Sequence, residues 1–81
     1  MDVDKILSGA RLIVTEDDNK KVVCLIRKAH PSDTHAMFGM MLADCARHVA
    51  KAFNVDEDAV FEWIERERRK PTSPIEGGMV Q

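Results

Sequence analysis

The chain has 81 residues, which is the size of one small domain. Hydrophobic residues make up 44% of the chain, an ordinary fraction for a folded protein, so the composition argues against a wholly disordered polypeptide. Lys and Arg number 12 and Asp and Glu number 14, which gives a net charge of −2. Because a general nucleic-acid binder is expected to be strongly basic, this charge argues against that class.

Residues 10–16 and 21–28 predict the two strands of an antiparallel hairpin. Both runs are short and rich in β-branched residues. Residues 17–20, Asp-Asp-Asn-Lys, favour a turn between them, because Asp and Asn side chains bond their own backbone and tolerate left-handed geometry. Neither face of the hairpin is cleanly polar, so either both faces are partly covered or the strands pair with something else.

Residues 34–53 predict a long amphipathic helix. Pro31 favours extended geometry before it, and Ser32 or Asp33 is then placed to act as the N-cap. The following apolar residues share one helical face that suits a core: Phe38, Met41, Leu42, Cys45, Val49 and Phe53. A neighbouring flank of small residues would let another helix approach closely: Gly39, Ala43, Ala46 and Ala50.

Residues 57–69 predict a second helix. Asn54 suits the end of the first helix because it tolerates left-handed geometry, and Asp56 suits the N-cap of the second. The apolar stripe of the second helix consists of Val60, Trp63 and Ile64. Two acid–base pairs have the spacing of helix-surface ion pairs: Glu62 with Arg66, and Glu65 with Arg69. Pro71 ends the helix.

This order of elements predicts an α+β fold of two layers, with a β-hairpin followed by two α-helices (ββαα). We expect a single domain over residues 1–70 and a partly flexible C-terminal tail over residues 71–81. An isolated hairpin is marginal in water, so two helices could cover one of its faces. Alternatively, a second copy could pair edge to edge with it, which would make a four-stranded sheet across a homodimer.

The sharpest cluster of polar side chains is Asp44, Arg47 and His48, whose spacing places them on one face of the long helix. Met37 and Met40 lie beside this cluster, and exposed methionines suit adaptable binding surfaces. We interpret these five residues as a candidate binding surface. The alternatives are a solvated helix face with ordinary ion pairs, and methionines that the tail or a dimer partner covers.

No constellation for catalysis or for metal binding stands out. Cys45 and His48 are three residues apart, but a structural zinc site normally has four ligands, and no second pair supplies the rest. Cys45 also falls on the predicted core stripe, where a cysteine behaves as a small hydrophobe. The sequence therefore predicts no catalytic residue, no metal and no cofactor.

Location and partners follow from the remaining features. Residues 1–10 carry Asp2, Asp4 and Lys5 before a short apolar patch, and no apolar run approaches the length of a membrane span. We therefore expect a cytoplasmic protein with reduced thiols and no membrane partner. The basic residues between Arg66 and Lys70 could touch phosphates, but the interleaved Glu62, Glu65 and Glu67 weaken their field.

The run from Phe38 to Ala50, Phe-Gly-Met-Met-Leu-Ala-Asp-Cys-Ala-Arg-His-Val-Ala, resembles the central signature of a small bacterial family, domain of unknown function family 5076. The residues that match the family's pattern are Gly39, Leu42, Asp44, Ala46, Arg47, His48, Val49 and Ala50. This chain has Phe38 where the family usually has Trp, and the stretch from Trp63 to Pro74 resembles the family's closing helix more loosely. The family has no assigned activity, so the resemblance singles out the polar cluster without giving it a role.

Taken together, these features favour a non-enzymatic protein-interaction module that acts as a homodimer or binds another protein. A small-ligand or enzymatic site around Asp44, Arg47 and His48 is the first alternative. Nucleic-acid binding through residues 66–70 is the second and weaker alternative.

Overall fold

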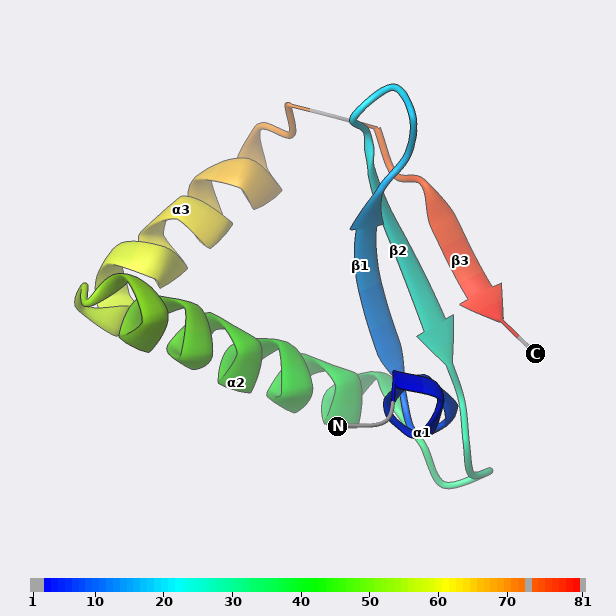
Figure 1. Cartoon of the computed structure of the whole chain (residues 1–81). Coiled ribbons are helices and arrows are strands. Elements are labelled where there is room, and N and C mark those ends of the chain that lie inside the picture. The colour runs from blue at the N-terminus through cyan, green and yellow to red at the C-terminus, as the bar shows by residue number, and fades with distance from the viewer. Residues whose placement is uncertain (1–2, 73, 81) are drawn as a thin grey trace. The chain divides into compact units, whose positions relative to one another are not determined.

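The structure is a computed structural model that describes residues 3–72 and 74–80. In chain order its elements are α1 (Val3–Ser8), β1 (Leu12–Glu16), β2 (Val22–Arg27), α2 (His35–Phe53), α3 (Glu57–Arg69) and β3 (Gly77–Val80) (Figure 1). The predicted α+β class, with a strand pair followed by two helices, is confirmed. The sequence did not predict the short helix α1 or the third strand β3.

The chain divides into two compact units. The first unit comprises the described residues up to Ser32 together with those of the β3 segment, and it holds the sheet. The second unit, Asp33–Thr72, holds α2 and α3. The prediction of a single domain with the helices layered on the hairpin concerns both units together, and it stays a prediction.

β1 and β2 form the expected antiparallel hairpin, in which Leu12 lies opposite Ile26 and Glu16 opposite Val22. The Asp17 carboxylate accepts hydrogen bonds from the backbone N–H groups of Asn19 at 2.8 Å and Lys21 at 2.9 Å. These bonds hold the turn closed, so the prediction of a turn at this point is confirmed.

β3 pairs with β2 in parallel, so the strand order in the sheet is β1-β2-β3. Gly77 lies opposite Cys24, and the Cys24 N–H donates to the carbonyl oxygen of Glu76 at 3.2 Å. Gly77 has φ +93°, and a Cβ added there would lie 2.1 Å from the carbonyl oxygen of Cys24. Glycine is therefore required at this position for the strand to approach its neighbour. β3 lies in the segment expected to be a tail.

The ends of α2 and α3 are fixed by local side chains. The prediction that Ser32 or Asp33 caps α2 is wrong, because the hydroxyl of Thr34 accepts the hydrogen bond from Met37 N–H at 3.3 Å. Asn54 ends α2 in the left-handed conformation, with φ 53°, as predicted. The Asp56 carboxylate caps α3 by accepting from Asp58 N–H at 2.8 Å, also as predicted.

The small-residue flank of α2 holds the buried part of the helical unit. Among the residues whose side chains the structure describes, the buried apolar ones are Ala46 and Ala50. Their small side chains allow the axes of α2 and α3 to approach closely. Three residues of the predicted core stripe are not buried. Leu42 and Val49 are about half exposed, and Phe53 is 75% exposed.

Candidate functional site

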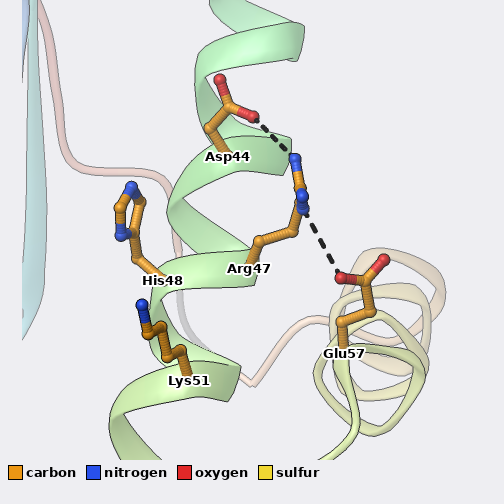
Figure 2. Close-up of a pocket in the computed structure, with 5 residues that line it drawn as sticks. All are labelled: Asp44, Arg47, His48, Lys51 and Glu57. Atoms are coloured by element: carbon orange, nitrogen blue, oxygen red, sulfur yellow. Dashed lines mark ion pairs between the residues drawn. The ribbon is translucent and has the colours of Figure 1, made fainter.

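The candidate polar cluster lies in the middle of α2, beside the first turn of α3. Asp44, Arg47, His48 and Lys51 of α2, together with Glu57 of α3, line a shallow hollow of about 290 Å³ (Figure 2). The hollow lies within the helical unit. Asp44, Arg47 and Glu57 side chains are each more than half exposed, so water reaches the charges freely.

Arg47 is held between two carboxylates. Its Nη1 lies 3.7 Å from Oδ1 of Asp44, one turn earlier in α2, and its Nε lies 3.5 Å from Oε2 of Glu57 in α3. The second ion pair joins the two helices. Exposed pairs of this kind contribute at most about 1 kcal/mol each, so Arg47 supports the helix pair modestly.

His48 lines the same hollow as Asp44 and Arg47 but does not take part in their ion pair. Figure 2 shows that the His48 ring points away from the Asp44–Arg47 pair and lies on the same side of α2 as Lys51. Within the part of the chain that the structure describes, no hydrogen bond or ion pair joins His48 to Asp44. The arrangement therefore does not couple the imidazole to a carboxylate as a proton relay would require.

Lys51 and Glu57 are the members of this site that were not predicted from the sequence, and Glu57 comes from the other helix. Helical spacing finds partners within one helix, whereas Glu57 reaches Arg47 across the turn that joins α2 to α3. The available signal was the short connection between the helices, since Asn54 ends α2 and Asp56 begins α3. A connection this short forces the last turns of α2 and the first turn of α3 to be neighbours.

The two candidate methionines are both exposed. Met40 is 63% exposed and Met37 is 37% exposed. Met37 with Asp44, and Met40 with Arg47, are seven residues or about two turns apart, so these four residues follow one side of α2. Together with His48 they form a continuous surface that we call the methionine surface, and its Asp44, Arg47 and His48 also line the shallow hollow.

Each helix also carries exposed apolar side chains away from Arg47. On α2 these are Leu42, Val49 and Phe53, and on α3 they are Trp63 and Ile64. We call these five residues the apolar helix surface. Leu42 and Val49 lie about 140–160° around α2 from Arg47, so the apolar and methionine surfaces occupy different sides of the helix.

The α3 part of the apolar helix surface borders a second hollow of about 440 Å³, which lies within the helical unit. Val60, Trp63 and Ile64 supply its apolar wall, and Glu67 and Arg68 lie at its polar rim. Arg66 lies over the Trp63 ring, with 4.8 Å from the guanidinium carbon to the ring centroid. This contact holds the indole in place on the helix surface.

The basic end of α3 is paired with acids of the same helix. Arg66 Nη2 lies 2.7 Å from Glu62 Oε1, and Glu65 accepts hydrogen bonds from both Arg68 and Arg69. These two guanidinium groups lower the pKa of the Glu65 carboxyl to about 2. Both predicted ion pairs are therefore present, and they reduce the positive field that a phosphate backbone would meet.

The described residues offer no other centre for chemistry. Both thiols are free, with Cys24 half-buried in β2 and Cys45 exposed on α2. In residues 3–72 and 74–80, no group of three or more His, Cys, Asp or Glu side chains is placed to hold a metal ion. Over the same residues, no helix combines the length and the apolar character needed to cross a membrane.

Comparison of the chain with protein-family models, curated proteins and solved structures finds no significant match. The resemblance to domain of unknown function family 5076 therefore stays a prediction.

Proposed function

We propose that this chain is a non-enzymatic protein-interaction module that acts in the cytoplasm as a homodimer. The apolar helix surface carries the proposal. Phe53 is 75% exposed and Trp63 is 67% exposed, although burying such a side chain fully stabilises a protein by about 1.5–3 kcal/mol. Large exposed apolar patches of this kind are typical of interaction sites rather than of monomers.

The side chains of this surface are those that anchor interfaces. Trp63 is large and amphipathic, and tryptophan is enriched among the residues that contribute most to binding. The ion pairs around it lie at the rim, where charges remain solvated and contribute little affinity. A contact centred on Trp63, Leu42 and Phe53 would thus have an apolar centre and a polar border.

A second copy of the chain suits this surface. A two-fold axis brings the same patch of each copy together, so an apolar stripe meets an apolar stripe. The rim residues Glu67 and Arg68 carry opposite charges, and both are already engaged within their own chain, Arg68 by Glu65 and Glu67 by Thr72. The net charge of −2 is too small to keep two copies apart.

The methionine surface is the second candidate contact. It holds Met40, which is as exposed as the residues of the apolar helix surface, and it is flanked by charged groups that suit a foreign protein partner. A role for its Asp44, Arg47 and His48 in ligand binding or catalysis has less support, because Arg47 is already engaged by two carboxylates.

Two matched variants on α2 separate these surfaces. Leu42→Glu places a charge on the apolar helix surface, and Met40→Glu places the same charge on the methionine surface, two residues away. Both positions are at least half exposed in the single chain, so both variants should keep the helix content measured by circular dichroism. We expect Leu42→Glu to weaken the dimer at least tenfold, measured by analytical ultracentrifugation, and Met40→Glu to leave it unchanged.

The opposite pattern would contradict the assignment of the contact. If Met40→Glu dissociates the dimer and Leu42→Glu does not, the methionine surface is the interface. If both variants and the unaltered chain are monomers at every concentration, the homodimer itself is refuted.

A further inference from the structure

We propose that the outer edge of β1 pairs antiparallel with β1 of a second copy, about a two-fold axis at Val14. The pairing would join two three-stranded sheets into one six-stranded sheet. This inference rests on the proposed homodimer and specifies where its two sheets meet.

The backbone of β1 presents at this edge a defined set of groups that have no strand partner among residues 3–72 and 74–80. Arg27 N–H donates to Arg11 O at 2.8 Å and Asp17 N–H donates to Lys21 O at 2.9 Å, so residues 11 and 17 both face β2. In an antiparallel pair the bonded residues alternate. The N–H and C=O groups of Leu12, Val14 and Glu16 therefore point away from β2, toward the open edge.

The opposite side of β2 confirms this alternation. Cys24 lies opposite Val14 in the hairpin, and its N–H points away from β1 to donate to Glu76 O at 3.2 Å. β2 thus has neighbours on both sides, whereas within the described residues the sheet ends at β1. An open edge of this kind is a template for another strand.

A two-fold axis at Val14 matches every outward group of β1. In this register Val14 pairs with Val14 of the second copy, and Leu12 pairs with Glu16 of the second copy. These are hydrogen-bonded pairs, and together they would form about six backbone hydrogen bonds. Moving the register by two residues in either direction would leave some of the outward groups outside the paired region.

The charge at the end of β1 disfavours a parallel arrangement. Glu16 is the last residue of the strand. Parallel pairing would set Glu16 beside Glu16 of the second copy, whereas antiparallel pairing sets it opposite Leu12. Opposite charges across strands stabilise a sheet, and like charges destabilise it. The charge pattern therefore favours the antiparallel, two-fold arrangement.

The side chains on the edge fit the same arrangement. Val14 is 63% exposed on the single chain, and it would meet its own counterpart at the axis. Ile13 would lie opposite Thr15 of the second copy, and pairs of β-branched residues pack well across strands. β1 carries neither proline nor lysine, the residues that commonly protect an edge from pairing.

Disulfide trapping tests the register directly. In a chain whose two cysteines are replaced by Cys24→Ala and Cys45→Ala, we introduce either Val14→Cys or Glu16→Cys. Hydrogen-bonded partners lie about 5.5 Å apart between Cα atoms, within the range that a disulfide spans. The two copies of residue 16 would be about 13 Å apart, which a disulfide cannot span.

We expect Val14→Cys to be at least tenfold more cross-linked than Glu16→Cys under mild oxidation, with both variants keeping the mass of the unaltered chain under reducing conditions. Equal cross-linking of the two variants, or none at Val14→Cys while the dimer mass persists, overturns this inference and leaves the homodimer standing. A monomeric mass for the unaltered chain refutes the homodimer and this inference together.

Discussion

At the scale of single residues, Gly77 decides whether β3 can lie against β2. A methyl group at this position would collide with the Cys24 carbonyl oxygen, and the backbone conformation, with φ +93°, disfavours any other residue. We expect Gly77→Ala to destabilise the docking of β3 by at least about 1 kcal/mol. Hydrogen exchange at the Cys24 amide, which donates to Glu76, measures this loss as faster exchange.

Gly39 provides a matched control for that substitution. It lies within α2, and a Cβ there would meet nothing within 4 Å. Gly39→Ala should therefore stabilise the helix by about 0.5–1 kcal/mol and leave exchange at Cys24 unchanged. If Gly77→Ala also leaves the Cys24 amide protected, the proposed steric requirement at Gly77 is wrong.

Glu65 is the described residue whose pKa departs most clearly from its ordinary value. Hydrogen bonds from Arg68 and Arg69 lower its pKa from 4.5 to about 2 in the folded chain. Because the folded-state pKa is lowered, the stabilisation is fully present above pH 4.5 and is lost as the pH falls toward 2. We expect the Glu65 carboxyl carbon to titrate near pH 2 in NMR spectra.

The variant Glu65→Gln keeps the shape of the side chain and removes its charge. In this variant, α3 should lose less stability between pH 4.5 and pH 2 than it does in the unaltered chain. Added salt should reduce this difference between variant and unaltered chain, since the Glu65, Arg68 and Arg69 side chains are solvent-exposed. A Glu65 midpoint near 4.5 would contradict the described pairing with the two arginines.

At the scale of whole elements, the first turn of α2 depends on its N-cap. The Thr34 hydroxyl accepts a hydrogen bond from Met37 N–H, so Thr34→Ala should cost about 0.5–2 kcal/mol of stability in thermal unfolding. Ser32→Ala, two residues earlier, should cost less than about 0.5 kcal/mol because it removes no cap. A larger loss for Ser32→Ala than for Thr34→Ala would restore the cap predicted from the sequence.

Local chemistry explains why the sequence predicted most elements well. The turn at residues 17–20, the ends of α2 and α3 and the pairs of Glu62 and Glu65 with arginines all depend on neighbours within a few residues. Such signals are present in the sequence itself. The wrong choice of Ser32 or Asp33 as the cap shows the limit of such signals, because Ser32, Asp33 and Thr34 are adjacent and each has a side chain that can cap a helix.

Long-range contacts explain what the sequence could not supply. β3 pairs in parallel with a strand more than 50 residues earlier, and it begins with two glycines, which are rare in strands. Its fit depends on the close approach of Gly77 to Cys24, which no local pattern reveals. Likewise, the helical period predicted both a core stripe and a flank of small residues, but not that Ala46 and Ala50 of the flank would be buried while Phe53 of the stripe stays exposed.

At the scale of the whole molecule, the central feature is the amount of apolar surface that a single chain leaves exposed. Among the described side chains the buried apolar residues are two alanines, while Leu42, Phe53 and Trp63 are at least half exposed. A chain of this size buries a smaller share of its surface alone than a larger domain does, so association with a second copy is an effective way to stabilise it. The apolar helix surface and the β1 edge are the two places where this association would act.

Solution mass over a dilution series, measured by light scattering on the unaltered chain, shows whether the homodimer forms. We expect a mass twice that of the 9.1 kDa chain at high concentration, falling toward the single-chain value on strong dilution. A mass of 9.1 kDa at every concentration would contradict the homodimer on which the proposed function depends.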